Sequence, residues 1–174
     1  FSFSCNKESA QPKDLNAVGK TDQALPAPSF GIGESLRPSA DSIARTWEAY
    51  MKVSEFLKTN ASLSNEESLY NAKDLAKLTE ALKDSIPLAD LNNPAVKIRL
   101  NVLHNEALRL QDMADIKIIT NKEITEERQK IYDAFSAINY KLNNMSEQAK
   151  INEQLKDFID IEGVDTTRNL LQKD

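Results

Sequence analysis

The chain has 174 residues, of which 40% are hydrophobic and 28% charged, and 27 acidic residues against 22 lysines and arginines give a net charge of −5. This mild charge, with no clustered Lys/Arg stripe, argues against nucleic-acid binding, and no run of about 18 apolar residues predicts a membrane-spanning helix. The single cysteine excludes an internal disulfide, and the single histidine excludes most histidine-based metal and triad chemistry.

Two phenylalanines and the small Ser4 precede the only cysteine, Cys5, and polar residues follow it. This order, over residues 1–5, resembles the end of a bacterial lipoprotein signal peptide, although Ser2 stands where that pattern usually has leucine. The resemblance implies lipid attachment at Cys5 and anchoring to the outer membrane of the cell envelope, on its periplasmic or surface face. The alternative is a buried or incidental free cysteine.

Residues 6–38 are expected to form a flexible tether, because proline and glycine recur there without a sustained hydrophobic period. They include Leu25-Pro26-Ala27-Pro28, Gly31, Gly33 and Arg37-Pro38. The helical domain is then predicted to cover residues 39–162, and residues 163–174 are expected to form a C-terminal tail.

The domain is predicted to begin with a helix over residues 39–59, because apolar residues recur there on one helical face. That face contains Ile43, Trp47, Tyr50, Met51 and Leu57. A second helix is predicted over residues 65–85, where Ser64 and Glu67 have the spacing of a capping box and Pro87 ends the helix.

A third helix is predicted from Pro94 to Lys117, with Asn93 as its cap and proline at its first position. Its apolar positions follow the spacing of one helical face and are Val96, Leu100, Leu103, Ala107, Leu110 and Ala114. Ile98 and Val102 widen this face, so we expect the helix to contact several neighbours.

The clearest amphipathic segment is Glu123–Met145, and Thr120 with Glu123 predicts a capping box at its start. Its apolar stripe consists of Ile124, Ile131, Phe135, Ile138, Leu142 and Met145. Arg128 lies on the same side. We expect its guanidinium to bind a carboxylate or carbonyl oxygens at the end of the bundle, because burying it unpaired is costly.

Ser146 is predicted to cap a further helix that runs to Ile161, if Asn143-Asn144 breaks the chain; the alternative is that this region only kinks one continuous helix. A single amphipathic helix cannot bury its own apolar stripe and needs partner helices. The sequence therefore predicts an all-α fold, an antiparallel up-and-down bundle of four long helices plus a short C-terminal helix.

No residue pattern predicts a catalytic centre, since the chain has no Gly-rich phosphate loop, serine nucleophile elbow or Cys–His pair. No enzyme activity, cofactor or bound metal is expected. His104 has no carboxylate or thiol at its helical neighbour positions and is interpreted as a structural residue at the edge of the core. Met51, Met113 and Met145 are interpreted as core residues, and a soft-metal site would require them to converge with His104.

Three aromatic residues lie on the first two predicted helices, namely Trp47, Tyr50 and Tyr70. They are interpreted as part of the core. The alternative is an exposed aromatic patch that binds a partner.

Several stretches match one family pattern: Tyr50-Met51-Lys52 with Leu57, then Leu75, Leu78 and Leu82, and finally Glu127-Arg128-Gln129 with Phe135-Ser136 and Leu142. In these features the chain resembles an uncharacterised helical domain family of bacterial envelope lipoproteins, which is also found beside copper/silver efflux adaptor subunits. The resemblance covers about half of the chain. Many such lipoproteins have a later Cys- and Met-containing segment that suggests metal handling, but this chain has no cysteine after Cys5.

Together these patterns predict a lipid-anchored cell-envelope protein that acts as a non-enzymatic binding or interaction module. Its acyl anchor would attach it to the membrane, and an envelope protein is a candidate partner. The alternative is an accessory protein for periplasmic copper or silver handling. A third hypothesis is an enzyme with an unrecognised carboxylate site.

Overall fold

The computed structural model describes residues 29–162, and it describes side-chain environments up to residue 157. Every regular element in this range is a helix, which confirms the predicted all-α bundle. The predictions for Cys5, for residues 6–28 of the expected tether and for the tail at 163–174 lie outside the described residues.

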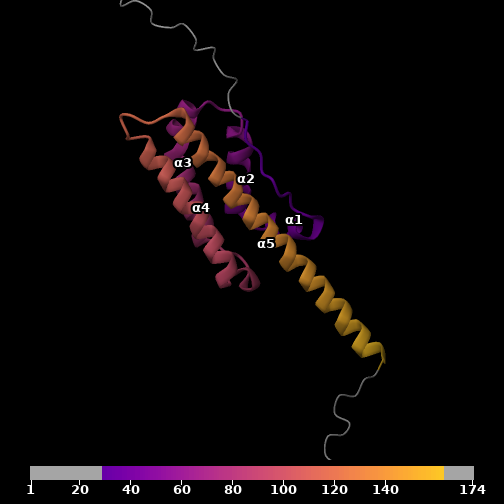
Figure 1. Cartoon of the computed structure of the whole chain (residues 1–174). Helices are drawn as coiled ribbons and strands as arrows, with labels where there is room; N and C mark the ends of the chain where they lie inside the picture. The colour runs from indigo at the N-terminus through magenta and orange to yellow at the C-terminus, as the bar shows by residue number, and fades with distance from the viewer. Residues whose placement is uncertain (1–28, 163–174) are drawn as a thin grey trace, which may run out of the picture.

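Four long helices and two short ones make up the described part of the chain (Figure 1). In chain order they are α1 (Pro38–Ala44), α2 (Glu48–Asn60), α3 (Asn65–Asp84), the 3-10 helix η1 (Ala89–Leu91), α4 (Pro94–Met113) and α5 (Asn121–Glu162). Short connections join α2 to α3, α3 to α4 and α4 to α5, as an up-and-down bundle requires.

Contacts between distant residues give the direction of each helix. Trp47, just before α2, donates from Nε1 to Ser85 Oγ, just after α3, over 3.3 Å, so α2 and α3 run in opposite directions. Asn65 Nδ2 donates to the carbonyl oxygen of the first residue of α5 over 3.0 Å, so α3 and α5 run in the same direction. Asn93, just before α4, lies 3.8 Å from the sulfur of Met145, so α4 runs against α5.

The predicted helix starts are confirmed at three places. Ser64 Oγ accepts from the Glu67 N–H over 3.2 Å and the Ser64 N–H donates to Glu67 Oε2 over 2.8 Å, which forms the expected capping box of α3. Thr120 and Glu123 make the same reciprocal pair at the start of α5. Asn93 Oδ1 accepts the backbone N–H three residues further on at the start of α4, over 3.1 Å. These side chains satisfy N–H groups that the helices leave free.

The apolar stripe of α5 lies in the core as predicted. Its buried members are Ile124, Ile131, Phe135, Ile138 and Leu142, each no more than 4% exposed, while Met145 is partly buried. The predicted face of α4 is buried from Val96 to Leu110. The periodicity of the sequence therefore identified which sides of α4 and α5 face each other.

The predicted first helix over residues 39–59 is wrong as a single element, because the chain breaks at residues 45–47 into α1 and α2. The Trp47 N–H donates to the Ala44 carbonyl over 2.9 Å and closes α1. Trp47 leaves the helical region, with φ −102° and ψ 88°, and its indole is 1% exposed. Burial of this large ring and packing of α1 against α5 stabilise a break that no Gly or Pro predicts.

The predicted short C-terminal helix over residues 146–161 is also wrong, because α5 continues without interruption to Glu162. Asn143 does not compete with the helix backbone, since its side chain bonds to another segment, and Ser146 Oγ donates to the Asn143 carbonyl within the helix over 2.9 Å. From residue 147 to 157 every side chain is exposed, and this part of α5 extends past the other helices (Figure 1).

Residues 29–37, here called the strap, were predicted to belong to the flexible tether, but they lie along α5 in an extended course (Figure 1). Phe30 is only 8% exposed. The folded domain therefore begins near Phe30 and not at residue 39, because the strap has specific polar partners that its short sequence, with two glycines and a proline on either side, does not reveal.

Some apolar residues remain uncovered within the described part of the chain. The third helix ends at Met113 and not at Lys117, and Ile118 in the connection after it is 91% exposed. Ile98 and Val102, which were expected to widen the contacts of α4, are 60% and 43% exposed. The narrow face of α4 is thus sufficient for its packing.

Candidate functional site

A row of polar residues on α5 holds the strap and the start of α1; it consists of Ser136, Asn139 and Asn143, which bind the strap, and Ser146, which accepts from Ser39 Oγ of α1 over 3.3 Å. The Gly33 N–H donates to Ser136 Oγ over 2.8 Å, and Asn139 Nδ2 donates to the Glu34 carbonyl over 2.7 Å. Asn139 Oδ1 accepts from the Tyr50 hydroxyl over 2.6 Å, so this amide connects the strap to α2 as well. Positions three and four apart share one helix face, which explains why the row lies along one edge of α5.

Asn143 makes the largest number of these contacts. Its Oδ1 accepts the Arg37 N–H over 2.8 Å, and its Nδ2 donates to the Ser35 carbonyl over 2.9 Å and to Glu34 Oε1 over 2.7 Å. The side chain is fully buried. A buried amide with all its partners in place fixes one position of the strap along the helix.

An aromatic residue holds the other end of the strap. The Phe30 ring stacks on Tyr132 with 5.3 Å between ring centroids, and the Phe30 N–H donates to the Ala61 carbonyl over 3.0 Å. The Tyr132 hydroxyl donates to the Leu57 carbonyl over 2.6 Å, and burial raises the pKa of Tyr132 to about 12. The strap is therefore joined to α5 at both of its ends, and at the Phe30 end also to the residue that follows α2.

Arg128 reaches carbonyl oxygens at the end of the bundle, as predicted. Its Nη1 donates to the Leu63 carbonyl and to Asn65 Oδ1, both over 2.9 Å, and its Nη2 donates to the Asn60 carbonyl over 3.2 Å. The guanidinium carbon also lies 4.1 Å from the centroid of the Phe30 ring. Burial lowers the pKa of Arg128, and these contacts compensate a charge that is only 2% exposed.

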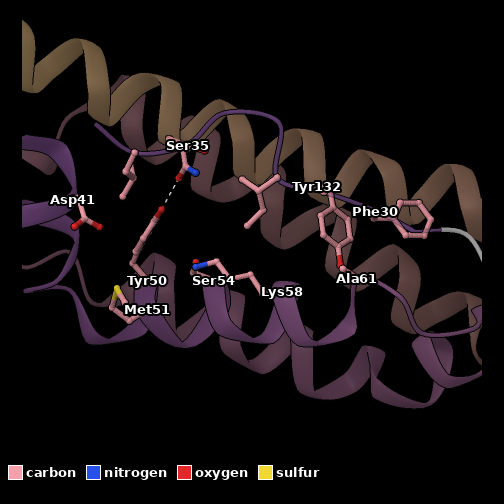
Figure 2. Close-up of a pocket in the computed structure, with 13 residues that line it drawn as sticks. Phe30, Ser35, Asp41, Tyr50, Met51, Ser54, Lys58, Ala61 and Tyr132 are labelled. Atoms are coloured by element: carbon pink, nitrogen blue, oxygen red, sulfur yellow. Dashed lines mark hydrogen bonds between the residues drawn. The ribbon is translucent and has the colours of Figure 1, made fainter. Parts of the chain in front are cut away.

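A cavity of about 430 Å³ lies between the strap, α1, α2 and α5 (Figure 2). This volume falls within the range of small-molecule sites. Its apolar wall includes Phe30, Ile32, Leu36, Met51, Ala61 and Tyr132, and its polar groups include Asp41, Ser54 and Lys58. Figure 2 shows Asp41 and Met51 at one end, Phe30 and Ala61 at the other, and Ser54 with Lys58 between them.

The two charged side chains in the cavity lining, Asp41 and Lys58, differ in whether they have a partner of opposite charge. Asp41 Oδ2 accepts from Arg45 Nε over 2.7 Å, so its charge already has a partner. Lys58 has no carboxylate within 4.0 Å among the residues that the structure describes. Burial, and then the charge of Asp41, raise the pKa of Tyr50, which stays a neutral donor to Asn139. Within the described residues, Lys58 is thus a cation of the cavity lining without a protein counter-ion.

Three of the residues considered for a metal site, Met113, Met145 and His104, lie apart. The fourth, Met51, was predicted to be a core residue, and that is wrong, because it is 38% exposed in the wall of the cavity. Met145 lies beside Asn93 at the start of α4 and Met113 is the last residue of that helix, so the two are roughly 30 Å apart along α4 at 1.5 Å per residue. His104 lies midway, where its Nδ1 is 3.0 Å from Thr79 Oγ1. Among the described residues no three His, Cys, Asp or Glu side chains form a group that could hold a metal ion.

The aromatic prediction is correct for two residues and wrong for the third. Trp47 and Tyr50 lie in the core, 1% and 3% exposed, and their rings are 6.1 Å apart. Tyr70 is 88% exposed, on the solvent side of α3. Only Tyr50 of these three lines the cavity.

A buried carboxylate pair between α4 and α5 was not predicted. Glu127 is 1% exposed, and its Oε2 accepts from Lys130 Nζ over 3.0 Å while Arg109 Nε lies 3.4 Å from its Oε1. Neither Glu127 Oε1 nor Glu106 Oε2 has a hydrogen-bond donor within the described residues. The neighbouring Glu127 carboxyl group, and then burial, raise the pKa of Glu106. Neither residue lines the cavity, so the pair has no access to a ligand there.

Ser54, Lys58 and the polar row were not predicted from the sequence as functional residues. Ser54 is only 6% exposed, although serine is a poor choice for a packed helix interior. Asparagine and serine at positions 136, 139, 143 and 146 share the spacing of one helix face. These two departures from an apolar pattern were the signals available in the sequence.

Within the described residues, no helix combines the length and apolar character needed to cross a membrane. Comparisons of the chain with protein-family models, curated proteins and solved structures found no match. The resemblance to envelope lipoproteins stays a prediction.

Proposed function

We propose that this chain is a lipid-anchored binding module of the cell envelope, attached through Cys5, that takes up a small ligand in the cavity between the strap and α2. The observation that carries the proposal is a ligand-sized cavity walled by apolar side chains and supplied with a few polar groups. The pattern around Cys5 supports the location, and the cavity supports the binding role.

The strap makes this cavity, because without it one long wall would be missing. Its hydrogen bonds to Asn139 and Asn143 hold it in a fixed course before any ligand arrives. A preformed site loses less conformational freedom on binding than a site that must be ordered. This supports binding by the domain as it is folded.

The polar groups of the cavity support binding more than catalysis. Lys58 is exposed, whereas a lysine that acts as a base needs a desolvated amine. Asp41 is held by Arg45, and the Tyr50 hydroxyl is engaged with Asn139. No specific observation favours the metal-handling alternative, since Met113, Met145 and His104 lie apart.

The binding role can be tested with the neutral fluorescent probe N-phenyl-1-naphthylamine and the full chain. We expect saturable binding at one site. Ser54→Leu should abolish it by filling the cavity, whereas Glu55→Leu, on the exposed side of the same helix, should leave it unchanged. No saturable binding, or equal binding by both variants with their folds intact, would contradict the proposal.

The anchor can be tested by mass spectrometry of the protein recovered from a Gram-negative host. We expect an acylated Cys5, and Cys5→Ser should release the protein from the membrane fraction. Recovery of an unmodified Cys5 from membranes would remove the anchor from the proposal while leaving the cavity untouched.

A further inference from the structure

We propose that the ligand of the cavity is a small amphipathic carboxylate, held at its head group by Ser54 and Lys58. This inference rests on the proposed function and adds the chemical class of the ligand. It follows from the hydrogen-bond and charge partners of Ser54, Lys58 and Asp41 in the cavity wall, and from the apolar side chains that form the rest of the lining.

Ser54 has a hydroxyl without a partner in the described part of the chain. Several serines inside or beside helices donate to the carbonyl four residues earlier, at distances of 2.7 to 2.9 Å; examples are Ser42, Ser68, Ser85 and Ser136. Ser54 has no such bond, although its side chain is more than nine-tenths buried and lines the cavity. The hydroxyl oxygen itself opens into the cavity, since the buried side-chain atoms left without a partner in the described residues are Glu106 Oε2 and Glu127 Oε1; a bound acceptor would replace water at Ser54 Oγ.

Lys58 is one helical turn further along α2, and Figure 2 shows its side chain lying toward Ser54 along the cavity wall. Residues four apart share a helix face, so a hydroxyl donor and an ammonium group lie side by side. Both groups donate hydrogen bonds, and Lys58 has no carboxylate partner among the described residues. This combination favours an anionic acceptor.

A cationic ligand is disfavoured, because Asp41 is the acidic residue of the lining and Arg45 already neutralises it. A single ammonium group matches the single charge of a carboxylate. A phosphate monoester would bring close to two negative charges and leave one without a counter-ion.

The remaining residues of the cavity wall are mostly apolar, which favours a ligand with an apolar tail. Ile32, Leu36, Met51, Ala61 and Tyr132 face the cavity, and its lining on α2 runs from residue 50 to 61, roughly 16 Å along the helix. A short alkyl or aryl chain would bury its surface against these groups. The ligand class that matches both parts is a monocarboxylate with a compact hydrophobic body.

The experiment is displacement of bound N-phenyl-1-naphthylamine from the full chain by decanoate, by decanol and by decyl phosphate. We expect decanoate to displace the probe at a concentration about threefold lower than decanol, since an ion pair at an exposed lysine is weakened by solvent. Lys58→Gln should remove this preference, and Ser54→Ala should reduce it. Lys52→Gln, which alters a lysine paired with Glu48 outside the cavity, should keep it.

Equal displacement by decanoate and decanol, or an unchanged preference in Lys58→Gln, would overturn the inference while probe binding still upheld the cavity as a site. Displacement by decyl phosphate at lower concentration than decanoate would overturn the choice of carboxylate. Failure of the probe itself to bind would instead count against the proposed function, so the two failures are distinguishable.

Discussion

The two sides of α5 hold the fold together by different means. The side toward the core carries Ile131, Phe135, Ile138 and Leu142, which are at most 2% exposed and pack against neighbouring helices. The edge toward the strap carries Ser136, Asn139 and Asn143, which bind the strap mainly through its backbone. Apolar packing is non-directional, whereas hydrogen bonds require particular atoms at particular places.

This difference separates stability from site formation. The apolar side supplies most of the free energy that keeps the bundle folded, because buried apolar area is the dominant favourable contribution in folding. The polar edge determines where the strap lies, and therefore the shape of the cavity. Substitutions on the apolar side should destabilise the whole bundle, whereas substitutions on the polar edge should have a smaller effect that is confined to the strap.

The largest effect is expected on the apolar side. Phe135→Ala removes a fully buried ring that stacks on Tyr50 with 5.1 Å between centroids, and it should lower the free energy of unfolding by about 4 kcal/mol. Chemical denaturation measures this change. Because the loss is global, amide hydrogen exchange should accelerate in the core of α3, α4 and α5 together. If exchange accelerated only in the strap, the apolar side of α5 would not be what stabilises the whole bundle.

A smaller and local effect is expected on the polar edge. Asn143→Ala removes the buried amide that bonds to Arg37, Ser35 and Glu34, at a cost of about 2 kcal/mol. Hydrogen exchange should accelerate at the Arg37 amide while α3 and α4 stay protected. The matched control is Asn144→Ala, because that neighbouring residue is exposed. Equal effects of both substitutions would show that the polar row does not hold the strap.

The smallest effect is expected at the carboxylate pair Glu106 and Glu127, between α4 and α5. Glu106→Gln should raise the free energy of unfolding by about 1 kcal/mol at pH 7, because an amide can donate to Glu127 Oε1, which has no hydrogen-bond donor among the described residues, and removes a like charge. Glu126→Gln, an exposed residue, is the control and should change nothing.

The pH dependence of this gain follows from the raised pKa of Glu106. The folded chain binds a proton there more tightly than the unfolded chain, so this group stabilises the fold below its ordinary value of 4.5 and that stabilisation is lost as pH rises through the folded pKa. The advantage of Glu106→Gln should therefore grow as pH rises from 4.5. An advantage that was largest at acid pH would show that the carboxyl pair is not the cause.

The sequence alone determined the features that depend on local pattern. The hydrophobic period identified the buried faces of α4 and α5, and the spacing of Ser64 and Glu67 identified a helix start, because both follow from the 3.6-residue turn. The sequence also predicted the type of partner that Arg128 binds, because a buried guanidinium needs oxygen atoms as hydrogen-bond acceptors.

Only the tertiary structure decided the strap, the break before α2 and the cavity. Asn143 looks like a helix breaker in sequence, but it becomes a helix residue whose amide binds a segment more than one hundred positions away. Trp47 interrupts a helix because its backbone leaves the helical conformation while its ring is buried in the core. Such outcomes depend on which distant groups meet, and the pattern of neighbouring residues along a chain does not contain that information.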